Sequence, residues 1–300
     1  MPATRLRPCD AQLLGLEAHP DDPSVLSFLV VPHLCRTDGR FYGGAALAVA
    51  LAASEAVTGR PALWSSTQLV ATADLGARVR VDVDVVAAGR SVSQVNVRGT
   101  VDGQLIFVAV GSTASARDGG LHGVGQVMPR VAPPEESEPR RGPRRRRAEA
   151  ESGNGGAAPA MPPSTVGHQL VSEHRDAPIL DATGARPGHM TMWARLTGDG
   201  PSGPVMSPAT LGFLADMVPL ACSRACGVEG AGTSLDNSLR IGEPVDTEWV
   251  LLELDAHVAV GGFGHGHVHL WSPDGRMLAT GTQSAILFSV DDFIRRRTAG

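Results

Sequence analysis

Hydrophobic and polar positions in the first part of the chain predict one buried helix among several strands. The Ala- and Leu-rich segment 43–57 is apolar on nearly all sides and holds no proline, which predicts a long, mostly buried helix. Charged residues alternate with valines over 78–86, a period of two that predicts a half-buried strand. Asp102-Gly103 predicts a type I′ hairpin turn. Further strands are predicted at 25–31, 64–71, 91–101 and 105–112.

The later part of the chain predicts similar elements in the same order. A helix is predicted to begin at Pro208, with Ser207 as its N-cap, and to end near Cys226, because Gly227 suits the position after a helix. Pro219 inside this helix predicts a kink or a local break. Strands are predicted at 190–196, 234–241, 248–260, 262–271 and 276–288, with a turn at 274–275 before the last.

A shift of 172 positions aligns the two parts without a gap. The residues that coincide are Phe41 with Phe213, Leu63 with Leu235, Ser66 with Ser238, Asp74 with Asp246, Gly89 with Gly261, Asp102-Gly103 with Asp274-Gly275, and Ser112 with Ser284. With the shared order of elements, these identities indicate an internal repeat. The segment 117–165 is rich in Gly, Pro and Arg and predicts a disordered linker. We therefore expect an N-terminal domain at 1–116 and a C-terminal, catalytic domain at 166–300.

Each half combines one long apolar helix with a run of antiparallel strands, which predicts an α+β fold. A sheet that curls around such a helix buries it on all sides, and two such sheets that pair edge to edge lose one exposed edge each. This arrangement is a double hotdog, in which two tandem hotdog domains each wrap an antiparallel sheet around a long central helix.

Composition narrows the class of protein. Of 300 residues, 42% are hydrophobic and 19% are charged, an ordinary globular balance. The net charge of −5 argues against a nucleic-acid binder but not against an anionic small molecule held by single arginines. The sequence has no apolar run that could span a membrane and no secretory leader, so the cytoplasm is expected. Four cysteines without a repeated Cys-x-x-Cys spacing indicate neither disulfides nor zinc, and Cys222 and Cys226 are expected on one buried helix face.

Several short motifs resemble those of one known family. Those of the first half are Phe41-Tyr42-Gly43-Gly44 before an Ala-rich helix, and Gly89-Arg90-Ser91 before Asp102-Gly103. Those of the second half are Leu214-Ala215-Asp216, Ser234-Leu235-Asp236-Asn237-Ser238, Asp274-Gly275 and Thr282-Gln283. Together they resemble the TesB-like acyl-CoA thioesterase II family, whose relatives include peroxisomal enzymes. The resemblance covers about 24–115 and 190–290.

This resemblance implies a thioester hydrolase of lipid metabolism, which cleaves fatty acyl-CoA into free fatty acid and CoA with a bound water and no cofactor. In that family an Asp on the helix, a Ser or Thr on the next strand and a Gln on the last strand hold the water. These roles map onto Asp216, Ser234 and Gln283. The chain departs from the family at Asn237, Ile241-Gly242 and Phe263, where the family often has His, Phe-His and Arg.

The chemistry of these three residue types suits that role. Thioester hydrolysis needs a base for the water, and burial on an apolar helix would raise the pKa of Asp216 toward a useful value. Ser234 can orient a water through its hydroxyl, and Gln283 can donate and accept at once. Each residue also has a structural alternative, namely a surface or ion-paired Asp, an ordinary strand serine, and a cross-strand hydrogen bond of the glutamine.

The internal repeat assigns this chemistry to the second half only. The aligned residues of the first half lack the functional groups: Gly44 falls opposite Asp216, Ala62 opposite Ser234, and Gly111 opposite Gln283. We therefore expect the first half to serve ligand support. Gly43 and Gly44, at a helix N-terminus, would let the backbone approach the thioester and offer N–H donors. With Arg90 they are the predicted substrate-binding residues.

Other interpretations stay open at this stage. His265, His267 and His269 alternate on one strand face, but such neighbours lie about 7 Å apart, so a polar surface is favoured and no metal is predicted. A catalytically silent hotdog protein that binds acyl-CoA or serves in assembly is one alternative. A hotdog enoyl-CoA hydratase is another, disfavoured because 208–227 contains no His. The expected partner is acyl-CoA, and a homodimer or larger homo-oligomer is left open.

Overall fold

The computed structural model describes residues 5–117, 119–140, 165–181, 186–197 and 206–289. The helices are α1 (Pro8–Leu14), α2 (Gly43–Thr58), α4 (Pro208–Ala215) and α5 (Val218–Ala225), with short 3-10 helices at Pro32–Leu34, Pro134–Glu136 and His168–Leu170. The first six strands are β1 (Glu17–Ala18), β2 (Val25–Leu29), β3 (Ala62–Leu69), β4 (Arg78–Ala88), β5 (Val92–Val101) and β6 (Gln104–Ala114). The others are β7 (Glu138–Pro139), β8 (Ser172–Asp176), β9 (His189–Leu196), β10 (Gly230–Ile241), β11 (Val250–Val260), β12 (Phe263–Trp271) and β13 (Met277–Ser289).

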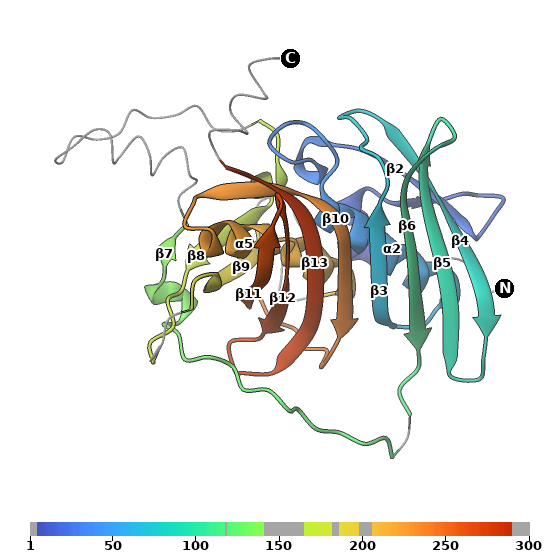
Figure 1. Cartoon of the computed structure of the whole chain (residues 1–300). Coiled ribbons are helices and arrows are strands. Elements are labelled where there is room, and N and C mark those ends of the chain that lie inside the picture. Colours follow the sequence, from blue (N-terminus) through green and yellow to red (C-terminus); the bar gives the residue numbers. More distant parts are fainter. Residues whose placement is uncertain (1–4, 118, 141–164, 182–185, 198–205, 290–300) are drawn as a thin grey trace.

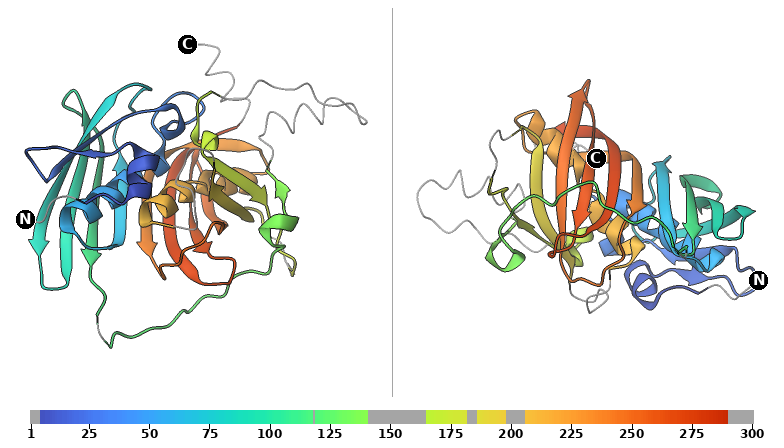
Figure 2. Two further views of the ribbon diagram at one scale, coloured as in Figure 1. Left: turned by 180° about the vertical axis from the view of Figure 1, so that it is seen from behind. Right: turned by 90° about the horizontal axis from the view of Figure 1, so that it is seen from below.

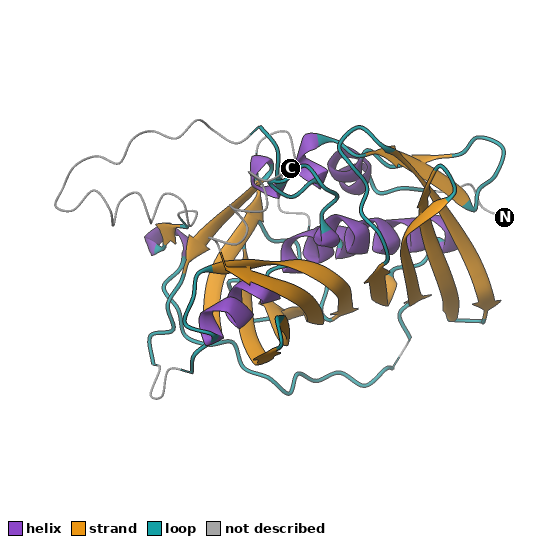
Figure 3. Cartoon of the chain, turned by 45° about the horizontal axis from the view of Figure 1, so that its top comes forward, coloured by secondary structure: helices purple, strands orange, loops and turns teal. Residues whose placement is uncertain are grey.

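The strands of both halves form one continuous antiparallel sheet of 13 strands (Figure 1). Their order is β1-β2-β4-β5-β6-β3-β10-β13-β12-β11-β9-β8-β7, so β3 and β10 join the two halves in the middle. Helix α2 lies on the inner side of this curved sheet, with α4 beside it (Figures 2 and 3). One hydrophobic core runs through both halves. The predicted double hotdog is confirmed.

Helix α2 is enclosed almost completely. Every residue from Gly43 to Ala56 is buried, as a helix that is apolar on all sides requires. The sheet covers one side of α2, and α4 covers another, where Gly212 lies close to the side chains of Leu47 and Leu51. The start of α2 is thereby fixed at the junction of the two halves.

The helix predicted over 208–226 is broken, as Pro219 predicts. Helix α4 ends at Ala215 and α5 begins at Val218, and the two residues between them, Asp216 and Met217, are not helical. In a continuous helix Pro219 would lack its backbone hydrogen bond, and its ring would clash with the carbonyl of Ala215. The break turns an aspartate from the middle of a predicted helix into a residue at a helix end.

The predicted helix cap and hairpin turn are both present. Oγ of Ser207 accepts a hydrogen bond from the N–H of Thr210 at 3.0 Å and caps α4. Asp102 and Gly103 both have positive φ, 49° and 81°, as a type I′ turn requires. The expectation of two cysteines on one buried face is wrong, because Cys226 lies beyond the end of α5 and is exposed.

Strands β3 and β10 meet in a locally twofold arrangement. Ser66 lies directly opposite Ser238, its equivalent under the shift of 172 positions. On either side the equivalents pair crosswise, with Trp64 opposite Arg240 and Gln68 opposite Asp236. A twofold axis between two equivalent strands produces this register, so the internal repeat is also a symmetry of the fold.

Part of the segment predicted to be a disordered linker is ordered against the C-terminal half. Val131 forms a β-bridge with Ile179, and Nε1 of Trp193 donates to the carbonyl of Ala132 at 2.9 Å. Strand β7 pairs with β8. These contacts satisfy backbone groups, which composition does not reveal. Residues 141–164 of the predicted linker lie outside the described residues.

Candidate active site

The break between α4 and α5 places Asp216 against the start of α2. The N–H of Gly44 donates to Oδ2 of Asp216 at 2.6 Å. Oδ1 accepts from Oγ of Ser234 at 2.9 Å and from Nε2 of Gln283. The same Nε2 lies 2.9 Å from Oγ of Ser234. The structure thus brings the three predicted catalytic residues together in one hydrogen-bonded cluster.

The register of the sheet and the helix break fix the partners of Asp216. Ser234 lies on β10 at a bulge, and Gln283 lies on β13 opposite Asn237. Oε1 of Gln283 accepts a hydrogen bond from the N–H of Val218 at 3.2 Å. This N–H belongs to the first residue of α5 and has no partner inside its own helix. The amide of Gln283 therefore ties the sheet to the helix break and is held in one orientation.

Burial raises the pKa of Asp216 above its ordinary value. Hydrogen bonds from Ser234, Gly44 and Gln283, and the neighbouring amide of Asn237, oppose this rise. The positive end of the α2 dipole also favours a negative charge at this position. The carboxylate is therefore held by fixed donors, yet it binds a proton more readily than an exposed aspartate does. This balance suits a base.

Gly43 and Gly44 are sterically required at the site. A Cβ on Gly43 would lie 2.7 Å from Oδ2 of Asp216 and 2.8 Å from Oγ of Ser234, and one on Gly44 would lie 2.7 Å from the carbonyl oxygen of Phe213. The N–H of Gly44 is used by Asp216. The N–H of Gly43 makes no hydrogen bond to any residue that the structure describes. Of the two predicted donors, only the one at Gly43 is left for a ligand.

Arg90 lies away from this cluster. It follows β4, and its carbonyl accepts a hydrogen bond from Arg60, which comes just after the C-terminal end of α2. A helix of 16 residues is ~24 Å long, and the cluster lies at its other end. The structure therefore does not bring Arg90 to the other predicted site residues.

Three buried polar residues that the sequence analysis did not assign surround the cluster. The hydroxyl of Tyr42 donates to the carbonyl of Asp216 at 3.3 Å, and burial raises the pKa of Tyr42. Nδ2 of Asn237 and Oγ1 of Thr67, on facing strands, have no hydrogen-bond partner of normal geometry among the described residues. Tyr42 and Asn237 lie inside two of the family motifs, 41–44 and 234–238, and this position could have marked them as site residues. Thr67 lies in no family motif.

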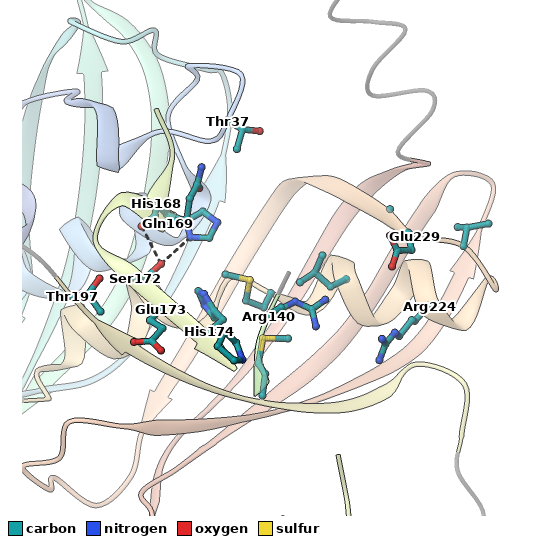
Figure 4. Close-up of a pocket in the computed structure, with 16 residues that line it drawn as sticks. Thr37, Arg140, His168, Gln169, Ser172, Glu173, His174, Thr197, Arg224 and Glu229 are labelled. Atoms are coloured by element: carbon teal, nitrogen blue, oxygen red, sulfur yellow. Dashed lines mark hydrogen bonds between the residues drawn. The ribbon is translucent and has the colours of Figure 1, made fainter. Parts of the chain in front are cut away.

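Two cavities share Ser234 and reach the cluster. One of about 310 Å³ is lined by Gly43, Ser234 and Arg40. Another of about 150 Å³ is lined by Asp216 and Ser234 and adjoins a larger one of about 700 Å³ (Figure 4). A substrate whose reacting carbonyl lies at Ser234 can therefore extend into either cavity.

Comparisons with known proteins now identify the family. Residues 134–287 match the acyl-CoA thioesterase C-terminal domain, and residues 32–115 match the acyl-CoA thioesterase N-terminal domain. The chain belongs to the acyl-CoA thioesterase family. The predicted resemblance to this family is confirmed. A search of curated protein sequences finds no match.

Solved structures agree with this membership. A candidate thioesterase from Novosphingobium aromaticivorans is 30% identical to this chain, with a TM-score of 0.74, and the match covers 90% of this chain and 97% of that protein. An acyl-CoA thioesterase II from Mycobacterium marinum is 18% identical, with a TM-score of 0.68, and the match covers 93% of this chain and 98% of that protein. A hotdog protein of unknown function from Alicyclobacillus acidocaldarius is 16% identical, with a TM-score of 0.71, and the match covers 95% of this chain and 99% of that protein. The last two show the fold alone.

The alternating histidines of the chain lie outside the cluster. His265, His267 and His269 occupy the outer face of β12, and Nε2 of His257 lies 2.7 Å from Nδ1 of His267. Within the described residues, no group of three or more His, Cys, Asp or Glu is arranged to hold a metal ion. None of the described helices is both long and apolar enough to cross a membrane.

Proposed function

We propose that this protein hydrolyses fatty acyl-CoA to free fatty acid and CoA, with Asp216 as the base that activates a water. The observation that carries the proposal is the hydrogen-bonded cluster of Asp216, Ser234 and Gln283 where cavities meet. A surface aspartate or an ion pair would not explain a buried carboxylate that collects three uncharged donors. Such an arrangement is costly unless the carboxylate is used.

The hydrogen bonds of Asp216 leave one position for a water. A carboxylate offers about four acceptor positions. Oδ1 accepts from Ser234 and Gln283, whereas among the described residues Oδ2 accepts one hydrogen bond, from the N–H of Gly44. We infer that the water donates to Oδ2. As the water attacks the thioester carbonyl its proton passes to Oδ2, the oxyanion forms near the N–H of Gly43, and the proton leaves with the thiolate when the C–S bond breaks.

The proposal gives the two halves unequal roles. The domain at 166–300 supplies Asp216, Ser234 and Gln283. The domain at 1–116 supplies backbone donors at the start of α2 and part of the walls of the cavities beside Ser234. The segment 117–165 connects them. Arg90 has no part in this chemistry.

Hydrolysis of a panel of saturated acyl-CoAs by the full-length protein tests the proposal. Free CoA and fatty acid should appear in equal amounts, measured by thiol release and chromatography. An enoyl-CoA that loses its double bond without releasing CoA would instead indicate a hydratase. Binding without any turnover across the panel would indicate a silent acyl-CoA-binding protein. Either result overturns the proposal.

The pH dependence of turnover should have an acid limb set by Asp216. The base acts only when ionised, so kcat/KM should fall as the pH falls through its pKa. Because burial raises that pKa, the midpoint should lie above the value of about 3.9 for an exposed aspartate. Circular dichroism over the same range would establish that the protein stays folded. An acid limb at or below the ordinary aspartate value would contradict the assignment.

A further inference from the structure

A cavity of about 700 Å³ follows one face of α5 away from Asp216. Met217, Leu220 and Arg224 line it and recur at helical spacing, so they form one stripe from the helix break to the end of α5. An eight-residue helix is ~12 Å long. Figure 4 shows His168 and His174 across the cavity from Arg224. The cavity is thus a passage with an apolar floor that begins beside the cluster.

This passage is continuous with the candidate active site. The 150 Å³ cavity that holds Asp216 and Ser234 shares Met217, Leu220 and His168 with the larger one. A group attached to a carbonyl at Ser234 therefore enters the space over α5 directly. Met192 and Met217 give this space flexible apolar walls, which suit an alkyl chain.

The cavity of about 310 Å³ suits the CoA side of the thioester better. It is lined by Arg40, which is exposed and forms no salt bridge with a described residue. CoA carries phosphates, which such a cation attracts. The charged residues of the large cavity are balanced instead, with Arg140 and Arg224 against Glu173 and Glu229.

One wall of the large cavity is polar and incompletely paired. Nε2 of His174 is buried and has no hydrogen-bond partner among the described residues. Burial, together with the neighbouring His168 and Arg140, lowers the pKa of His174 to about 3, so its ring is neutral. Ser172 lies two residues before His174 on β8 and is already hydrogen-bonded to His168. A buried ring nitrogen without a partner is costly, which points to a polar atom of the ligand.

We propose that this cavity takes the acyl chain and selects chains that carry an uncharged oxygen, a hydroxyl or an oxo group, which pairs with Nε2 of His174. This inference rests on the proposed function, because it takes the thioester to lie at Ser234. His174 lines only the larger cavity, beyond the one that holds Asp216. The oxygen therefore belongs on a carbon well removed from the thioester.

The test compares octanoyl-CoA with octanoyl-CoAs that carry one hydroxyl at successive carbons. For the best isomer kcat/KM should exceed that of octanoyl-CoA by about tenfold. His174→Phe should bring the kcat/KM values for octanoyl-CoA and the hydroxylated isomer to within about twofold of each other, whatever its turnover of octanoyl-CoA. His174→Gln, which retains a donor and an acceptor, should keep much of the preference. His265→Phe, on the outer face of β12, serves as the matched control and should change nothing.

Calorimetric titration separates this inference from the proposed function. With Asp216→Asn, the same acyl-CoAs should show the same preference in Kd, whether or not the wild type turns them over. Equal affinity for plain and hydroxylated chains would overturn the inference and leave hydrolysis intact. A preference for suberoyl-CoA over both would also overturn it, since it would indicate a terminal carboxylate bound by Arg224. A preference that survives in His174→Phe would do the same.

Discussion

Asp216→Asn should lower kcat for acyl-CoA hydrolysis by roughly 10²- to 10⁴-fold, the usual contribution of a positioned base. The amide has nearly the shape of the carboxylate, but its NH2 group replaces one of the two oxygens that accept from Gly44, Ser234 and Gln283, and it cannot accept a proton from water. The loss should fall on kcat and leave the affinity for substrate nearly unchanged. Steady-state thiol release gives both quantities.

A matched control for this loss is Asp246→Asn. Asp246 is exposed in the same half of the chain and falls outside the cavities that reach the cluster. The substitution Asp246→Asn removes the same charge as Asp216→Asn and should keep wild-type turnover. If Asp216→Asn retained more than about a tenth of the activity while circular dichroism showed a native fold, the base would have to be another group.

Local patterning predicted most of the fold. Alternation over 78–86, the all-apolar segment 43–57 and the pair Asp102-Gly103 each report a local requirement, and each appears where expected. Pro219 predicted the break that positions Asp216. The predicted catalytic residues came from motif resemblance, because Ser234 and Gln283, far apart in the sequence, meet only through the register of β10 and β13.

The features that sequence could not give are those fixed by long-range contacts. Residues 131–140 look like a linker in composition, yet Val131 forms a bridge with Ile179, and Glu138 and Pro139 pair with β8. Arg90 shares a motif with the family but lies at the wrong end of α2. His174 has no motif at all, and its unpaired nitrogen shows only when the strand is folded over the cavity.

The local twofold symmetry explains why only one half carries the carboxylate. Gly44 and Asp216 are equivalent under the shift of 172 positions, and they touch each other. An aspartate at both positions would place two carboxylates side by side in an apolar interior, where at most one could ionise. A glycine opposite the aspartate instead supplies an N–H donor and leaves room for Phe213 and Tyr42. The asymmetry is therefore a requirement of contact across the axis.

Gly44→Ala should damage both stability and turnover for this reason. The new Cβ would lie 2.6 Å from Cε1 of Tyr42 and 2.7 Å from the carbonyl oxygen of Phe213, so α2 must move away from α4. We expect a loss of roughly 1–3 kcal/mol in the free energy of unfolding, as overpacked cores show. Displacing the N–H also weakens a hydrogen bond to a charged group, which should lower kcat by roughly tenfold or more.

The pH profile distinguishes this specific effect from general damage. The hydrogen bond from Gly44 lowers the pKa of Asp216, so its loss should raise that pKa and move the acid limb of kcat/KM to higher pH. A merely loosened core would lower the melting temperature without moving the limb. Gly125→Ala, at a position where an added Cβ meets no atom within 4 Å, should alter neither quantity. A wild-type acid limb in Gly44→Ala would mean that the N–H of this glycine does not hold the carboxylate that sets the limb.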